Sequence, residues 1–222
     1  MSTNYTLVLG TRNTSSWSLR PWLAMKMASI PFHETFINLD TPETRKTIAA
    51  HSPSGKVPAL VIEENGMGRT LWDTLAICET LAERHKEATL WPQESARREE
   101  ARCIVAEMHS GFHNLRKTMP MDLAARHPTP KIDSALGDEI ERIKSIWVSA
   151  LERFGHEGGF LFGKFSLADC FYAPVVTRFE TYAIALPAIT QAYAQHVLSL
   201  EPMREWTQAA KKEVARGVRV LE

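Results

Sequence analysis

A run of hydroxyl side chains, Thr14-Ser15-Ser16-Trp17-Ser18, stands at the start of a predicted helix near the N-terminus of the chain. Serines at such a position commonly cap the helix. They also suit an anion held at the positive end of the helix dipole. A thiolate is such an anion, and it is the nucleophilic form of a thiol whose reference pKa is about 8.5. Lowering that pKa by about two units requires about 2.7 kcal/mol, which one hydrogen bond to the charged sulfur and a helix terminus supply.

Two more motifs follow in the same half of the chain, Ser54-Gly55-Lys56-Val57-Pro58 and Trp72-Asp73-Thr74-Leu75-Ala76-Ile77. Each is common by itself, since loops contain Gly and Pro and Asp-Thr is an ordinary helix cap. Together with the serine run they indicate a site that holds a thiol peptide and ionises its sulfur.

The elements that must position these motifs alternate between strand and helix. Hydrophobic periodicity and turn residues predict the order β-α-β-α-β-β-α, which is typical of an α/β layer. The predicted strands cover residues 5–9, 32–39, 57–62 and 70–72, and the predicted helices cover residues 16–30, 42–50 and 74–85.

The second half of the chain has a different pattern, with no convincing strand. It predicts helices over residues 95–119, 132–154, 167–184, 188–198 and 202–215. We therefore expect an α/β domain over residues 4–85, a linker over residues 86–93 and an all-helical domain over residues 94–217.

The bulk composition limits the classes of function. The 222 residues carry 26 basic and 26 acidic side chains, so the charge balance does not favour a nucleic acid or an anionic membrane as partner. No apolar run approaches the roughly 20 residues that a membrane span needs. The start of the chain lacks the pattern of a secretion signal, and the three cysteines predict reduced core residues and no metal site. A cytoplasmic protein is expected.

The residues from Ser15 to Met25 align without gaps with Ser-Ser-Cys-Ser-Trp-Arg-Val-Arg-Ile-Ala-Leu, the pattern of zeta-class glutathione transferases. The chain resembles this family, nearest to its serine-using zeta, tau and theta classes, over almost its whole length. The resemblance implies a thioredoxin-like first domain, an all-α second domain and a homodimer. Its register places the catalytic serine on Ser15, with Ser16 as the rival, and places Trp17 where zeta enzymes have cysteine.

The same resemblance implies how glutathione, as co-substrate, would be bound. Val57 would pair with the cysteinyl backbone, next to a cis Pro58, and Lys56 would meet the glycyl carboxylate. Asp73 and Thr74 would take the ammonium and carboxylate of the γ-glutamyl end. The family's structural capping box corresponds to two residues of the second half, Ser166 and Asp169.

A substrate pocket is expected beside these residues. His109, Phe112, His113 and Arg116 are spaced to share one face of a helix, where Arg116 could bind a substrate carboxylate and Trp17 could line the pocket. The alternative is an ordinary helix at a domain interface.

The resemblance implies a glutathione transferase, whose thiolate attacks a small electrophile. One alternative is a glutathione-dependent isomerase of the maleylacetoacetate type, and another is a noncatalytic transferase-like binding or regulatory protein. The sequence leaves the electrophile undetermined.

Overall fold

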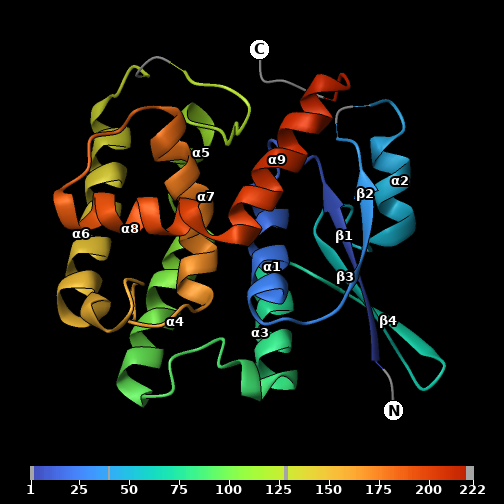
Figure 1. Ribbon diagram of the computed structural model, residues 1–222. Coiled ribbons are helices and arrows are strands. Elements are labelled where there is room, and N and C mark those ends of the chain that lie inside the picture. The colour runs from blue at the N-terminus through green and yellow to red at the C-terminus, as the bar shows by residue number, and fades with distance from the viewer. Residues whose placement is uncertain (1–2, 40, 128–129, 219–222) are drawn as a thin grey trace.

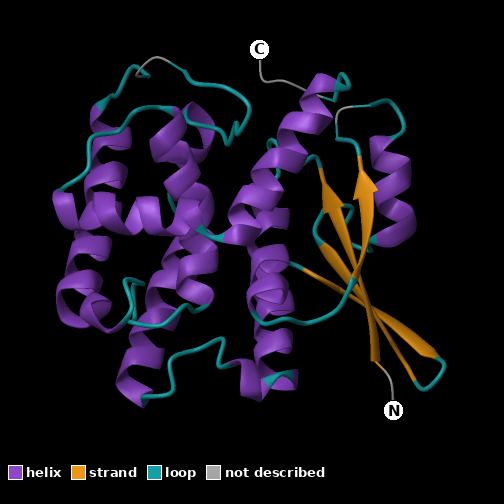
Figure 2. Ribbon diagram, viewed as in Figure 1, coloured by secondary structure: helices purple, strands orange, loops and turns teal. Residues whose placement is uncertain are grey.

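A four-stranded sheet forms the first layer of the molecule, in a computed structural model that describes residues 3–39, 41–127 and 130–218. The strands lie in the order β2-β1-β3-β4, and they gather on one side of the molecule (Figure 2). β1 is parallel to β2 and antiparallel to β3, and β3 is antiparallel to β4. Their bounds are Thr3–Gly10 for β1, His33–Ile37 for β2, Ala59–Glu64 for β3 and Met67–Trp72 for β4.

Helices cover both faces of this sheet, which makes the thioredoxin-like arrangement (Figure 1). The alternation of side chains along β1 explains the two faces. Leu7 and Leu9 point into the large core that includes α1 and α3, whereas Val8 packs with Ile48 of α2 on the other side. The helices are α1 (Ser16–Met27), α2 (Thr44–His51) and α3 (Thr74–Arg84).

The remaining helices form a bundle against the α1 side of the sheet. α7 lies at its centre with almost every residue buried, and α9 runs back beside α1 (Figure 1). No helix of the described residues is both long enough and apolar enough to span a membrane. The bounds are α4 (Ser95–Ser110), α5 (His113–Thr118), α6 (Ser134–Phe154), α7 (Leu167–Thr181), α8 (Ala188–Ser199) and α9 (Glu201–Ala215), with 3-10 turns at Lys86–Ala88 and Gly155–Glu157.

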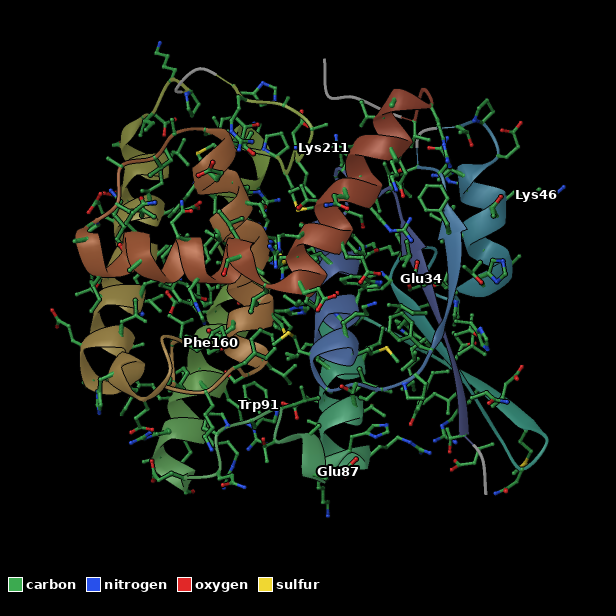
Figure 3. The ribbon with its side chains drawn as sticks, in the orientation of Figure 1. Glu34, Lys46, Glu87, Trp91, Phe160 and Lys211 are labelled. Carbon is green, nitrogen blue, oxygen red and sulfur yellow. The ribbon has the colours of Figure 1, made fainter. Side chains whose placement is uncertain are left out.

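Arg12 joins the sheet to the last helix. Its guanidinium pairs with Glu34 of β2, labelled in Figure 3, and with Glu213 of α9. The indole N–H of Trp206 on α9 donates to the backbone carbonyl of Arg12 at 3.0 Å. These contacts fix the loop between β1 and α1 from the side of the C-terminal helix.

Three predictions about local structure are wrong. The single helix over residues 95–119 is interrupted: Gly111 is extended and Phe112 is left-handed at φ 58°, so α4 ends and α5 begins there. The second helix, predicted to begin at Pro42, begins at Thr44, and its cap position is Glu43. Cys103 is exposed on α4 rather than part of the core.

A capping box holds the start of α7. The backbone N–H of Ser166 donates to Asp169 Oδ2 at 2.8 Å, and the N–H of Leu161 donates to Oδ1 at 3.1 Å. Asp169 is fully buried, and this burial raises the pKa of its carboxyl to about 6. The box orders the helix that carries much of the bundle core.

Candidate functional site

The serine run lies at the carboxyl end of β1, where the loop enters α1. Ser15 occupies the cap position of α1, but its side chain makes no hydrogen bond to the first backbone N–H groups of the helix. Instead Ser15 Oγ donates to Ser18 Oγ at 2.8 Å, and Ser18 Oγ accepts from the backbone N–H of Gly10 at 3.1 Å. The hydroxyl of Ser15 is therefore not used as a helix cap, the role that an ordinary serine would have there.

Ser16 has a different partner. Its Oγ accepts a hydrogen bond from Arg178 Nη2 of α7 at 3.3 Å. Because Ser16 is the acceptor in this contact, its own proton stays free to be donated to another group. Ser15 and Ser16, the two serines considered for the catalytic role, thus differ in their surroundings.

The second motif forms the loop before β3. The Val57–Pro58 peptide bond is cis, Val57 is half-buried and Lys56 is exposed. The end of β1 approaches this loop closely: a Cβ on Gly10 would lie 3.0 Å from the Val57 side chain. Glycine at the end of β1 thus lets the serine loop and the Val57 loop meet.

The third motif begins α3. Asp73 has φ 73°, a backbone conformation that costs a non-glycine residue about 1–3 kcal/mol and that concentrates at ligand sites. Its Oδ1 accepts from the backbone N–H groups of Leu75 and Ala76 at 2.8 and 3.2 Å. Its Oδ2 lies 3.2 Å from Nε2 of His109 on α4. Asp73 thus caps α3 and reaches the helical bundle.

Thr74 is buried, and its hydroxyl is already engaged. Thr74 Oγ1 donates to the backbone carbonyl of Trp17 at 3.1 Å. This hydrogen bond ties the start of α3 to the start of α1. The backbone N–H of Thr74, rather than its hydroxyl, is then the group at this helix terminus that suits an anion.

Trp17 lies between two arginines. The guanidinium carbons of Arg20 and Arg116 stand 4.6 and 4.5 Å from the centre of its ring. His109 meets the same ring edge-on, with the ring centres 5.4 Å apart. The two cation–π contacts contribute about 1 kcal/mol each, since Arg116 is only half-buried.

The interruption between α4 and α5 changes the expected pocket. His109, Phe112, His113 and Arg116 do not share one helix face, because the left-handed Phe112 starts a new helix. His109 and Arg116 still meet at Trp17. Phe112 is buried at the interruption, and His113 is exposed on α5.

Sequence reasoning missed two further arginines, Arg20 and Arg178. Arg20 Nε donates to the Phe171 carbonyl at 3.1 Å, and Arg178 Nε donates to the Met119 carbonyl at 2.7 Å. Only a weak signal was present: each lies on a helix with many apolar residues, but α1 also carries Lys26 and α7 also carries Asp169 and Glu180.

The guanidinium of Arg116 binds backbone carbonyls at the C-terminal end of α4. It donates to the backbone carbonyls of Met108 and Gly111, the latter at 3.2 Å. Burial lowers the pKa of Arg116, and burial with the neighbouring arginines lowers the pKa of Arg20 and brings that of Arg178 to about 9. A positive region therefore lies behind the serine loop.

A second network, also absent from the sequence predictions, secures the loop before α1. Asn13 Nδ2 donates to Asp122 Oδ1 at 2.9 Å, and Asn13 Oδ1 accepts from the N–H groups of Leu123 and Ala124, each at 2.9 Å. Asp122 Oδ2 lies 2.9 Å from Nε2 of His127. The segment after α5 is thereby fixed against the loop that carries the serines.

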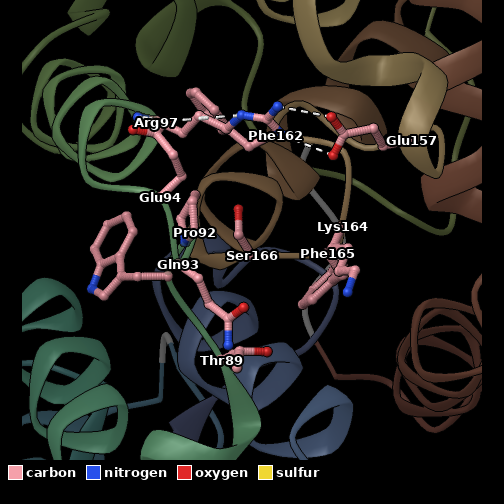
Figure 4. Close-up of a pocket in the computed structure, with 11 residues that line it drawn as sticks. Thr89, Pro92, Gln93, Glu94, Arg97, Glu157, Phe162, Lys164, Phe165 and Ser166 are labelled. Carbon is pink, nitrogen blue, oxygen red and sulfur yellow. Dashed lines mark hydrogen bonds and ion pairs between the residues drawn. The ribbon is translucent and has the colours of Figure 1, made fainter.

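A cavity of about 370 Å³ lies elsewhere, between residues 89–97 and the start of α7 (Figure 4). Arg97 and Glu157 in its wall pair with each other through two contacts of 2.8 Å. Of the predicted residues only Ser166 lines it, and its role is structural. Within the described part of the chain, no three His, Cys, Asp or Glu side chains are grouped as metal ligands.

Family models match both halves of the chain. Residues 14–84 match the glutathione S-transferase N-terminal domain, and residues 137–209 match the glutathione S-transferase C-terminal domain. The maleylacetoacetate isomerase of Pseudomonas aeruginosa is 28% identical over 183 residues, which cover 80% of this chain and 82% of that protein.

Solved structures share the fold. Glutathione transferase Omega 2S from Trametes versicolor superposes with a TM-score of 0.72 at 21% identity, covering 98% of this chain and 99% of that one. The maleylacetoacetate isomerase from Anaeromyxobacter dehalogenans, solved with glutathione in its active site, has a TM-score of 0.64 at 21% identity. That match covers 98% of this chain and 99% of the isomerase.

Proposed function

The chain belongs to the glutathione transferase family, and from that premise we propose that it binds glutathione at the three motifs and presents the sulfur as a thiolate to a small electrophile. The observation that carries this proposal is the meeting of the serine loop, the Val57 loop and the start of α3 at one end of the sheet. Three features suit an anionic sulfur: the N-terminus of α1, the hydroxyls of Ser15 and Ser16, and the positive charge of the nearby arginines.

Ser15 is proposed as the donor to the sulfur, with Ser16 as its rival. Ser15 Oγ turns from Ser18 Oγ, its partner at 2.8 Å, to the thiolate when glutathione is bound. This exchange replaces a neutral hydrogen bond with a stronger one to an ion. Ser16 requires no such exchange, because its proton is not committed to Arg178.

The peptide is proposed to lie across the other two motifs. The backbone of Val57 pairs with the cysteinyl unit as a neighbouring strand would, and Lys56 attracts the glycyl carboxylate. Asp73 faces the γ-glutamyl ammonium, and the N–H of Thr74 faces its carboxylate. His109 Nε2, 3.2 Å from Asp73 Oδ2, limits the rotation of that carboxylate.

The proposed reaction is a nucleophilic attack by the thiolate. The thiol proton passes to solvent, and a lone pair of the sulfur forms the new C–S bond. The electron pair of the bond broken at the electrophile leaves with a leaving group or takes up a proton. The residues proposed here hold the thiolate and its peptide, which is catalysis by positioning and electrostatic stabilisation.

Calorimetry with glutathione on the wild type and on Ser15→Ala and Ser16→Ala tests this proposal. We expect binding by all three proteins and a loss of turnover with a haloaromatic electrophile in the variant that lacks the donor. The proposal is contradicted if the wild type shows no binding at millimolar glutathione, a result that would favour a noncatalytic binding protein.

A second candidate is glutathione-dependent isomerisation of a small unsaturated diacid. In this reaction the sulfur adds to the double bond, the resulting single bond rotates, and the C–S bond breaks as the double bond reforms. Two observations favour it: relatives named maleylacetoacetate isomerase, and the cation Arg116, whose Nη1 has no hydrogen-bond partner among the described residues.

Arg116→Gln separates the two candidates. Isomerisation predicts a KM for the diacid that rises at least tenfold, because a carboxylate loses its cation. Transfer to an uncharged haloaromatic predicts an almost unchanged KM. Equal effects on both substrates would argue against a carboxylate at Arg116.

We also propose a cytoplasmic homodimer, as the family membership suggests. Sedimentation equilibrium would then give twice the 25.0 kDa of one chain. A mass of one chain at micromolar concentration would contradict the dimer.

A further inference from the structure

Three arginines, Arg20 of α1, Arg116 of α5 and Arg178 of α7, form a cluster behind the serine loop. Their hydrogen-bond acceptors are backbone carbonyls, one thioether and the hydroxyl of Ser16. Within the described residues no carboxylate forms an ion pair with any of them. A buried cation without an anion is costly. The cluster therefore invites a negative charge that the chain itself does not provide.

Burial prevents a negatively charged ligand from contacting two of these arginines directly. Arg20 is inaccessible to solvent and Arg178 is 4% exposed, so a ligand cannot reach the two guanidinium groups without displacing the core. Nη1 and Nη2 of Arg20 are buried without a hydrogen-bond partner among the described residues. The cluster acts through its field, which is screened much less inside a protein than in water.

One hydrogen bond links the arginine cluster directly to the serine loop. Arg178 Nη2 donates to Ser16 Oγ at 3.3 Å, and Ser16 begins α1, where the helix dipole is also positive. A hydroxyl that accepts from a guanidinium becomes a stronger donor, because hydrogen bonds in a chain polarise one another. The donor strengthened in this way is Ser16, the rival of Ser15 for the hydrogen bond to the sulfur.

We propose that Arg178 is a positioning residue that stabilises the bound thiolate through Ser16, with Arg20 and Arg116 adding to the positive potential at the start of α1. This inference rests on the proposed binding of glutathione and deepens it by assigning the source of the stabilisation. No bond is formed or broken by the arginines, and their protonation does not change in the step.

Other titratable groups face the cluster, and among them the carboxylate of Glu139 offsets only part of the charge, at Arg116. Burial raises the pKa values of the neighbouring Cys78 and Tyr172 and of Tyr182, so these groups stay neutral at pH 7. Two carboxylates lie nearby with other partners. Asp122 is bonded to Asn13 and His127, and Glu139 accepts from the backbone N–H groups of Asn114 and Leu115.

Titration of bound glutathione by thiolate absorbance tests the inference, with the wild type, Arg178→Met, Arg178→Lys, Ser16→Ala and Arg116→Met. Calorimetry first establishes that each protein binds glutathione, and circular dichroism that each is folded. The wild type reports on the proposed function, since a lowered thiol pKa there shows that the site ionises glutathione. The variants report on the arginines alone.

We expect Arg178→Met to raise the thiol pKa by about one unit, which reduces the thiolate about tenfold at neutral pH. Arg178→Lys keeps the charge and restores at least half of that shift, which a purely structural role would not do. Ser16→Ala shifts the pKa in the same direction, and so does Arg116→Met by a smaller amount.

The inference is wrong if folded, glutathione-binding Arg178→Met titrates like the wild type. If Arg178→Met does not fold, the thiol pKa of glutathione bound to Ser16→Ala and to Arg116→Met tests the inference. A pKa equal to the wild-type value in both variants overturns it. If the wild type binds no glutathione, the proposed function fails first, and the inference falls with it.

Discussion

The two sides of the candidate site are built in different ways. On the sheet side, short segments at element ends supply hydroxyls and backbone groups, as at Ser15, Val57 and Thr74. On the helical side, α1, α5 and α7 bring three cations together behind the same loop, and Arg20 and Arg178 are buried in the core. The comparison teaches that recognition of a peptide backbone depends on local segments, whereas the electrostatics of the site depend on how distant helices pack.

The largest effect is expected for Ser15→Ala, which removes one hydrogen-bond donor from the sheet side. We predict that kcat/KM for glutathione addition falls about 100-fold, as for the loss of one donor to a developing or stabilised anion. The melting temperature should stay close to that of the wild type, because Ser15 does not cap α1. Steady-state kinetics check this against Ser16→Ala, whose activity should also fall, but by less. If Ser16→Ala lost more activity, the two serines would exchange roles.

Asp169→Asn sharpens the comparison on the helical side, because it should affect folding and leave the chemistry alone. Burial raises the pKa of Asp169 to about 6, so the folded state binds its proton more tightly than the unfolded chain, whose Asp pKa is about 3.9. The stability contributed by this proton is present below about pH 4 and is lost as the pH rises through about 6.

The measurement is urea unfolding of wild type and Asp169→Asn between pH 4 and pH 7. The wild type should lose about 2 kcal/mol relative to the variant across this range, at about 1.4 kcal/mol per pKa unit. A difference that does not change with pH would contradict the assignment. Other acidic groups are common to both proteins and cancel.

Trp17 lies where the two sides meet, so replacing it tests how strongly they are coupled. Trp17→Leu removes the ring between Arg20 and Arg116, and we expect a loss of about 2 kcal/mol in the free energy of unfolding. Trp17→Phe keeps an aromatic face and should lose about half as much. Equal losses for the two variants would show that packing, and not the ring, holds the cations.

The smallest effect is expected for Lys56→Gln on the exposed edge of the sheet side. Exposed ion pairs contribute at most about 1 kcal/mol, so the Kd for glutathione should rise about two- to fivefold without a change in stability. Lys46→Gln is the matched control, since Lys46 points away from α2 into solvent (Figure 3). If the control weakened binding equally, Lys56 would have no specific role.

The sequence predicted the order of the elements and the local structure at the three motifs well, because periodicity, turn residues and helix starts are local signals. It failed where the conformation of one residue mattered, as at the left-handed Phe112 that separates α4 from α5. It also missed Arg20 and Arg178, since no local pattern shows which apolar helices will pack together. The corresponding partners, Phe171 for Arg20 and Ser16 for Arg178, are 151 and 162 residues away.

The most direct test of the central proposal is the pH titration of the thiol of glutathione bound to the wild type, followed by thiolate absorbance. The proposal predicts a pKa well below the reference thiol value of about 8.5, and a return toward that value in Ser15→Ala while glutathione still binds. A bound thiol that titrates at the reference value in the wild type would contradict it.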